Sequence, residues 1–188
     1  MILQTYQSTR AARAIPNILV VIMGVALMTL AARTQVPFWP VPMTLHTLAV
    51  MGFAVALGPR MAVAIVSAYL AAGAMGVPVF SGSPERGIGL AYMVGPTGGY
   101  LLGYLLAAGL TGYLARGRGT LGRFGAMGLG LVVVYAAGAA WLATLLPANQ
   151  ILAVGVLPFV IGDLAKIALV AMGAALIPAL ITRLRGRI

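Results

Sequence analysis

Six long apolar stretches, separated by short segments that carry arginine or proline, constrain the fold of this chain more than any other feature. A membrane-spanning helix needs about 20 predominantly apolar residues, and each stretch approaches or exceeds that length. Only 7% of the residues are charged, against about 25% in a soluble domain, so too little polar surface exists to coat a globule in water. The stretches cover residues 16–32, 43–57, 61–79, 92–115, 124–146 and 156–184. The sequence therefore predicts an all-α, polytopic membrane protein with six transmembrane helices in a single domain, residues 1–188.

The arginines predict which end of each helix faces the cytoplasm, because basic residues are enriched in the cytoplasmic loops of membrane proteins. Nine arginines would lie on one side of the bundle, and only Arg33 and Arg86 on the other. The nine are Arg10, Arg13, Arg60, Arg116, Arg118, Arg123, Arg183, Arg185 and Arg187. We therefore expect cytoplasmic N and C termini and a multi-pass location in a bacterial cell (inner) membrane. The net charge of +10 therefore comes from arginines at the ends of apolar segments, where they orient membrane helices. We expect lipid as a partner and no nucleic acid.

Two charged side chains lie inside the last apolar stretch. Asp163 is one of two acidic residues in the chain, and Lys166 is its only lysine. Residues three apart share a helix face. A charge at membrane depth costs about 2.5–3.5 kcal/mol on insertion scales and normally faces a cavity, a partner or a ligand. Two interpretations stay open: a self-neutralising pair that only fixes helix packing, or a ligand site with one acceptor arm and one cationic arm.

Polar and aromatic residues gather on the predicted outer side. The loop 33–42 contains three prolines, which stiffen it and remove backbone donors, and its Phe38 and Trp39 are expected to anchor at the interface. His46 opens the second helix, where a packing role and a ligand contact are both open. The flexible, polar loop 78–89 is interpreted as a lid or a specificity loop. Further candidate ligand contacts in and after this loop are Phe80, Ser81, Arg86 and Tyr92.

These groups predict a pocket for a small anionic molecule that carries hydrogen-bond donors. An ionised Asp163 accepts N–H bonds from a urea- or amide-like head, and Lys166 or Arg86 would counter a carboxylate. A solvated turn is the alternative role for Arg86. Binding pockets are mostly apolar with a few placed polar groups, and Phe80 and Tyr92 would supply part of the apolar wall.

The sequence lacks the residues that most enzymes and ATPases need. It contains no G-x-x-x-x-G-K-[ST] phosphate-binding loop. Cysteine is absent and His46 is the single histidine, which excludes a metal site built from cysteine and histidine within one chain. We therefore expect a protein that is not an enzyme and has no cofactor. The energy for any transport would come from a partner or an ion gradient.

Five short motifs resemble the BioY family, the biotin-specific substrate-binding (S) components of energy-coupling factor (ECF) transporters. Two of them are specific: residues 95–101 (GPTGGYL) resemble G-P-T-G-G-Y-L, and residues 158–166 (PFVIGDLAK) resemble P-F-x-x-G-D-x-x-K. Three shorter motifs agree with them, namely residues 41–47 (VPMTLHT), 57–60 (LGPR) and 76–80 (GVPVF). The resemblance extends over all six predicted helices in order.

The resemblance implies high-affinity biotin uptake, with biotin bound from the outside. Asp163 would accept the ureido N–H groups, Lys166 would add a polar or cationic contact, and the loop 80–89 would cap the ligand. The implied partners are an ECF transmembrane component and ABC ATPase subunits, which accounts for the missing phosphate loop. The chain departs from the family in two places. His46 stands where the family usually has glutamine, and helix 16–32 lacks the A-x-x-x-A pattern often used for docking to the transmembrane component.

Two other functions remain open from the sequence. A stand-alone vitamin transporter, as a monomer or a homo-oligomer, would need no ATPase partner. A structural membrane protein would use the Asp163–Lys166 pair for packing alone. In that case, Asp163→Asn and Lys166→Ala would reduce folded yield without a ligand being involved.

Overall fold

The computed structural model describes residues 2–36 and 40–185, including the side chains of residues 15–35 and 40–176. Phe38 and Trp39, the expected interfacial anchors, lie outside the described residues. Within the described chain, eight α-helices and one two-stranded antiparallel sheet occur. The helices are α1 (Ile2–Arg33), α2 (His46–Leu57), α3 (Pro59–Ala74), α4 (Gly89–Met93), α5 (Gly98–Leu114), α6 (Thr120–Leu142), α7 (Ala148–Gly155) and α8 (Leu157–Arg185), and the strands are β1 (Gln35–Val36) and β2 (Met43–Thr44).

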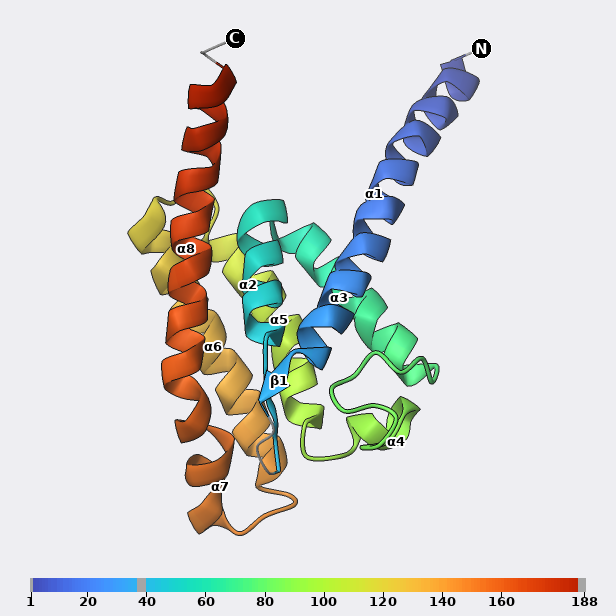
Figure 1. The fold of residues 1–188 in the computed structure, drawn as a ribbon. Helices are drawn as coiled ribbons and strands as arrows, with labels where there is room; N and C mark the ends of the chain where they lie inside the picture. The colour runs from blue at the N-terminus through green and yellow to red at the C-terminus, as the bar shows by residue number, and fades with distance from the viewer. Residues whose placement is uncertain (1, 37–39, 186–188) are drawn as a thin grey trace.

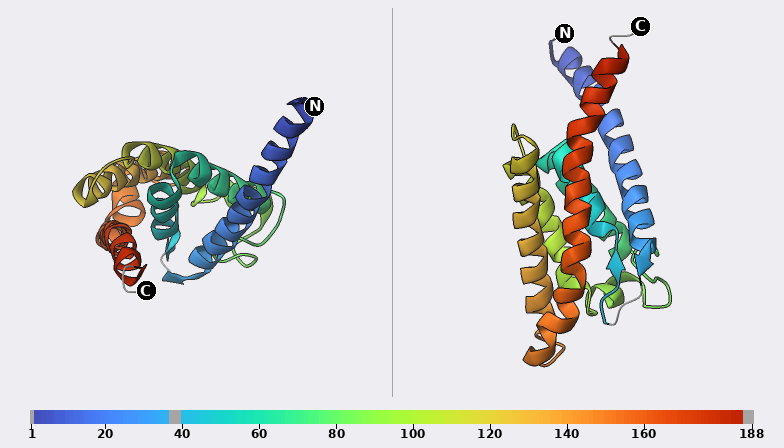
Figure 2. Two further views of the ribbon diagram at one scale, coloured as in Figure 1. Left: turned by 90° about the horizontal axis from the view of Figure 1, so that it is seen from above. Right: turned by 60° about the vertical axis from the view of Figure 1, so that its left-hand side comes forward.

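The longer helices run alternately in opposite directions. In Figure 1, α1, α3 and α6 run from the upper end of the molecule to the lower end, and α2, α5 and α8 run back. The start of α1 and the end of α8 therefore lie together at one end, here called the terminal end, whereas β1, α4 and α7 lie at the other, the loop end (Figures 1 and 2). Three helical stretches of the described chain are long and apolar enough to cross a membrane: Ile15–Arg33, Thr120–Leu142 and Ala148–Leu176.

Local sequence explains where the helices depart from the predicted stretches. The third helix ends at Ala74 rather than near residue 79, because Gly76 adopts φ = 92°, a left-handed conformation that favours glycine, and Pro78 follows. The fourth stretch is divided: α4 is separated from α5 by a turn that contains Pro96. The short helix α7 was not predicted; it begins directly after Pro147.

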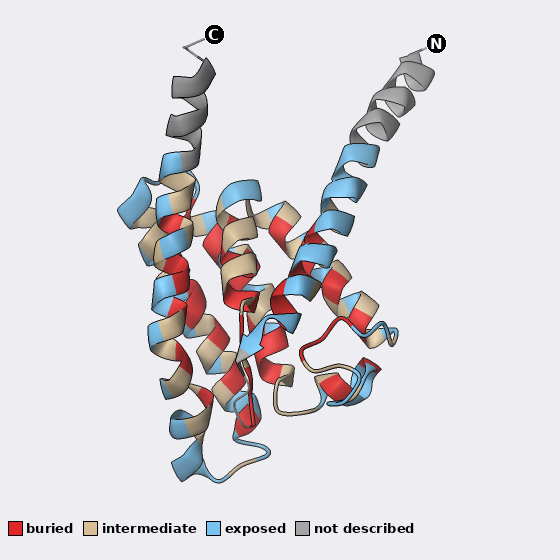
Figure 3. Ribbon diagram, in the orientation of Figure 1, coloured by how far each residue is buried: buried red, intermediate tan, exposed pale blue. Residues whose placement is uncertain are grey.

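The second helix is short and lies inside the bundle. With 12 residues, α2 is about 18 Å long at 1.5 Å per residue, well below the roughly 30 Å thickness of a bilayer core. It packs against α1, α3, α5 and α8. The chain that leads into it, residues 40–45, is not helical and is largely buried, and Figure 3 shows it as a mostly red thread between the helices. Irregular backbone at membrane depth is tolerated only where protein covers it or where it lines a cavity, so this extended segment (residues 40–45) points to a binding site.

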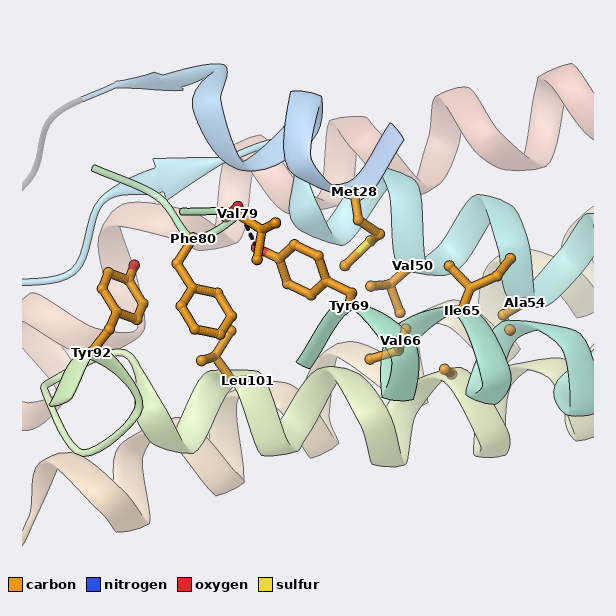
Figure 4. Close-up of a cluster of buried hydrophobic side chains, with 12 residues drawn as sticks. Met28, Val50, Ala54, Ile65, Val66, Tyr69, Val79, Phe80, Tyr92 and Leu101 are labelled. Carbon is orange, nitrogen blue, oxygen red and sulfur yellow. Dashed lines mark hydrogen bonds between the residues drawn. The ribbon is translucent and has the colours of Figure 1, made fainter. Parts of the chain in front are cut away.

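The core consists of two clusters of buried apolar side chains, and α2 contributes to both. Val50 of α2 belongs to the first cluster, with residues of α1 and α3 and of the 75–88 loop that connects α3 to α4 (Figure 4). Met51 belongs to the second cluster, with residues of α5, α6 and α8. The extended segment and the start of α2 therefore lie between the two halves of the bundle.

The helices α5 and α6 approach each other closely because glycines line their contact. A Cβ atom on Gly103 would lie 2.8 Å from the Cα atom of Val134 and 3.1 Å from its carbonyl oxygen. On Gly99, a Cβ atom would overlap the Ala137 carbonyl and the Trp141 Cβ atom. Small residues allow membrane helices to approach at backbone distance. These five residues form the contact called here the glycine seam.

Candidate functional site

The predicted contact between Asp163 and Lys166 is present on α8, and it faces the extended segment. The Lys166 Nζ atom donates to Asp163 Oδ1 at 2.8 Å and to the Thr44 carbonyl at 2.7 Å. On the other side, the Tyr135 hydroxyl of α6 donates to Asp163 Oδ2 at 2.7 Å. Asp163 and Lys166 are only 4% and 8% exposed. Three segments far apart in the sequence therefore meet at a buried ion pair.

This ion pair has bonding capacity beyond its contacts with the described residues. A carboxylate accepts up to about four hydrogen bonds and an ammonium group donates three. Asp163 receives one bond on each oxygen, and Lys166 uses two of its three protons. A ligand beside the pair would therefore meet two acceptor positions and one cationic donor, with no net charge.

A narrow inner pocket opens beside the ion pair. It has about 20 Å³ of space open to the centre of a water molecule, and a water needs at least about 10–15 Å³ by this measure. A middle pocket of the same size shares part of its wall and continues toward the 75–88 loop. The shared wall consists of Val41, Pro42, Thr44, Tyr100 and Tyr104, and the middle pocket adds His46, Ser81, Tyr92, Thr97 and Leu101.

An outer pocket of about 330 Å³ continues this series to the surface. It shares Tyr92 and Thr97 with the middle pocket, and the exposed side chains of Glu85 and Arg86 line it. The three pockets thus lead from Arg86 to the ion pair, with the extended segment along one side.

Two other predicted residues of the 75–88 loop, Phe80 and Ser81, lie in its buried middle part, residues 79–81. The ring of Phe80 packs between Tyr69 and Tyr92, with centroid distances of 5.5 Å and 4.7 Å (Figure 4). Ser81 is buried and donates its hydroxyl to Gln35 Oε1. Phe80 therefore holds the loop in the core, whereas Ser81 and Tyr92 line the middle pocket.

His46 is buried, and both of its ring nitrogens bond to protein atoms. Its Nδ1 atom lies 2.8 Å from Thr44 Oγ1, and its Nε2 atom lies 2.8 Å from the Tyr69 hydroxyl. The ring also stacks on Tyr104, with centroids 5.3 Å apart. His46 thus contributes to the wall of the middle pocket while its nitrogens bond within the protein.

Sequence reasoning missed much of the inner pocket. The aromatic rings of Tyr100, Tyr104 and Phe159, the hydroxyl of Tyr135 and the carbonyl of Thr44 were not among the predicted site residues. The tyrosines could have indicated this pocket from the sequence. Tyr100 and Tyr104 are four apart and share a helix face, and buried tyrosine hydroxyls usually need a polar partner. A backbone carbonyl leaves no such signal in a sequence.

Comparison with known proteins identifies relatives along most of the chain. The sequence model of the BioY family matches residues 5–183. A probable biotin transporter BioY from Pyrococcus horikoshii is 37% identical over 144 residues, which cover 77% of this chain and 85% of that protein. A biotin transporter BioY from Thermotoga maritima is 36% identical, with coverage of 78% and 86%. One from Rhizobium etli is 38% identical, with coverage of 72% and 76%.

A solved structure shares the fold. The crystal structure of the S-component for biotin from an ECF-type ABC transporter matches with a TM-score of 0.77 and 24% sequence identity, covering 89% of this chain and 93% of that one. That structural likeness shows that the helices of the two proteins are arranged in the same way. The sequence matches show that this chain is related to the BioY proteins. This chain is a multi-pass membrane protein that belongs to the BioY family.

Proposed function

We propose that this chain binds biotin from outside the cell and acts as the S component of an ECF-type ABC transporter. The observation that carries the proposal is the buried Asp163–Lys166 pair with unused bonding capacity at the inner end of the pocket series. The relatives named biotin transporters support the choice of ligand.

The chemistry of the inner pocket fits the ureido ring of biotin. That ring carries two N–H donors and one carbonyl acceptor. A remaining lone pair of Asp163 would accept one of the two N–H groups, and the third proton of Lys166 would go to the carbonyl next to it. Hydrogen bonds with an ionised partner are stronger than neutral ones. Tyr100, Tyr104 and Phe159 would pack against the ring system, as the walls of a mostly apolar pocket do.

The carboxylate tail of biotin would point toward the outer pocket. The ion pair carries no net charge, so it gives little attraction to an anion. Arg86, in the outer pocket, offers the matching positive charge. The ligand would thus lie along the pocket series, with its ring inward and its tail outward, and His46, Ser81 and Tyr92 would line its middle.

Binding requires part of this site to move. The inner and middle pockets have about 20 Å³ each, which is room for about one water. The parts that cover the site are the extended segment and the 75–88 loop. That loop contains Gly76 and Gly87, which have φ values of 92° and 103°, so it has points where the backbone can bend. We infer that the loop opens to admit biotin and closes over it.

The proposed topology has six membrane-crossing segments with both termini in the cytoplasm. The alternating helix directions support it (Figure 1). The α2–α3 and α5–α6 connections, which carry or adjoin Arg60, Arg116, Arg118 and Arg123, lie at the terminal end, as the bias of basic residues toward the cytoplasm requires. The pocket series, at the loop end, would then face outward. Energy would come from a transmembrane component and ABC ATPase subunits, because this chain has no phosphate-binding loop.

Calorimetric titration of the detergent-purified chain with biotin tests the ligand. We expect tight one-to-one binding without partner subunits and weaker binding by Asp163→Asn. Gly128→Ala is the matched control, because a Cβ atom there meets no other atom within 4 Å. Absence of binding by a folded, monodisperse sample would contradict the proposal.

Uptake of labelled biotin into cells tests the S-component role. The chain is produced in a host without its own biotin uptake, with and without an ECF transmembrane component and ATPase subunits. We expect uptake only when the partners are present. Equal uptake without them would instead support a stand-alone transporter.

A further inference from the structure

A continuous line of hydrogen bonds joins the ion pair to the 75–88 loop. The Lys166 Nζ atom donates to the Thr44 carbonyl at 2.7 Å. The Thr44 hydroxyl bonds to His46 Nδ1 at 2.8 Å, and His46 Nε2 bonds to the Tyr69 hydroxyl at 2.8 Å. The Tyr69 hydroxyl donates to the Val79 carbonyl at 3.0 Å. The line passes from α8 through the extended segment, α2 and α3 into the loop.

The last bond determines where the protons lie. The Tyr69 hydroxyl has one proton, which goes to the Val79 carbonyl, so its oxygen accepts from His46 and His46 Nε2 must carry a proton. His46 Nδ1 then accepts from the Thr44 hydroxyl, whose oxygen also receives the His46 backbone N–H at 3.3 Å. A neutral imidazole protonated on Nε2 satisfies every link.

Because the residues of this line are buried, breaking any of its hydrogen bonds is costly. The side chains of Thr44, His46 and Tyr69 and the residue Val79 are all buried, and a buried polar group without a partner is costly. Thr44 meets Lys166 through its carbonyl and His46 through its hydroxyl, so a rotation of the extended segment disturbs both bonds. Tyr69 also contacts the ring of Phe80, so the line ends where the loop enters the core.

We propose that His46, as the neutral Nε2-protonated tautomer, is a positioning residue that couples the ion pair to closure of the 75–88 loop. This inference rests on the proposed function, since the closed loop is what retains the ligand. A ligand that engages Lys166 holds the Thr44 carbonyl in place, and His46 and Tyr69 pass that constraint to Val79. A glutamine at position 46 also offers one donor and one acceptor, so His46→Gln should preserve the coupling and His46→Leu should abolish it.

The tautomer is directly measurable because the chain has a single histidine. Labelling with ¹⁵N-histidine gives ring-nitrogen signals from His46 alone. In the purified protein at neutral pH, we expect a neutral ring with its proton on Nε2. Tyr69→Phe, which removes the acceptor of that proton, should shift the Nε2 signal, whereas Thr111→Val, which removes a buried hydroxyl of α5 outside this line, should leave it unchanged. An imidazolium or an Nδ1-protonated ring would overturn the proposal.

Loop opening is measurable because the chain has no cysteine. Val79→Cys places a single thiol at a buried position of the loop, and its labelling rate by a maleimide reports opening. We expect His46→Leu and Tyr69→Phe each to raise that rate about tenfold, the factor that corresponds to about 1.4 kcal/mol. Both changes together should exceed either alone by little, because they break the same line. His46→Gln and the control Thr111→Val should stay near the parent rate.

Two outcomes of the labelling experiment would overturn the coupling: equal rates in all variants, or a His46→Gln rate as high as that of His46→Leu. The biotin dissociation rate separates this failure from failure of the proposed function. If the parent binds biotin and His46→Leu leaves both dissociation and labelling unchanged, His46 has no such role and the ligand stands. If the labelling and tautomer results hold but the parent does not bind biotin, the coupling stands and the proposed ligand is wrong.

Discussion

The glycine seam between α5 and α6 and the polar contact between α8 and the extended segment join parts of the bundle by opposite chemistry. In the seam, Gly99 and Gly103 bring two backbones together with close packing. At the polar contact, Lys166 bonds to a carboxylate and a backbone carbonyl. Packing stabilises helix association in lipid, whereas a buried ion pair is weak evidence for stability because desolvation offsets its attraction. The seam therefore explains stability, and the polar contact calls for a functional explanation.

Breaking the polar contact should have the largest effect. Lys166→Met leaves Asp163 as a buried charge without its partner, and loss of one member of a buried pair costs about 3–5 kcal/mol. Thermal unfolding and folded yield in detergent measure this loss. The double variant Asp163→Asn with Lys166→Met removes both charges, so it should recover much of the stability.

The double variant also separates the two interpretations of the pair. If the pair binds the ureido ring, the double variant folds but loses most of its biotin affinity. Wild-type affinity in that variant would show that the pair only packs.

Weakening the polar contact from the α6 side should have a smaller effect. Tyr135→Phe removes the hydroxyl that donates to Asp163 Oδ2, and a hydrogen bond to a charged group contributes about 1.5–3 kcal/mol. We expect lower biotin affinity as well as lower stability, because this bond orients the carboxylate. Tyr113→Phe is the matched control, since Tyr113 is 69% exposed. Equal affinity of the two variants in calorimetry would remove Tyr135 from the site.

Filling the glycine seam should cost stability and leave the site intact. Gly99→Ala forces a methyl group against the Ala137 carbonyl and Trp141, and overpacking typically costs about 1–3 kcal/mol. On the same helix pair, Gly128→Ala adds a methyl group in open space and should stabilise α6 by about 0.5–1 kcal/mol. The folded fraction of Gly99→Ala should bind biotin with unchanged affinity. A large loss of affinity there would mean that the seam is part of the site.

The exposed end of the pocket series should give the smallest effect. Arg86 is exposed, and exposed ion pairs contribute about 0.2–1 kcal/mol. Arg86→Gln should therefore weaken biotin binding by no more than about fivefold, and added salt should reduce the difference. Biotin methyl ester, which lacks the carboxylate, should bind both proteins equally. An equal loss for the ester would show that Arg86 does not meet the carboxylate.

The site could be predicted where it depends on neighbours along one helix. The contact between Asp163 and Lys166 follows from a spacing of three residues on a helix. The bonds from Lys166 to Thr44 and from His46 to Tyr69 join residues 122 and 23 positions apart. No periodic pattern encodes such partners. His46 shows the difference most clearly: its type and place at the start of a helix were evident, but its bonds with Thr44 and Tyr69 were not.

The sequence by itself determined the membrane class and the long apolar helices, because a bilayer leaves an apolar chain few ways to satisfy its backbone. It also determined the spacing of the ion pair and the glycines that let α5 and α6 approach. Only the tertiary structure decided that the extended segment passes between the core clusters and that its Thr44 carbonyl meets Lys166. These features arise from how the helices pack around one another, and packing joins residues that the sequence keeps far apart.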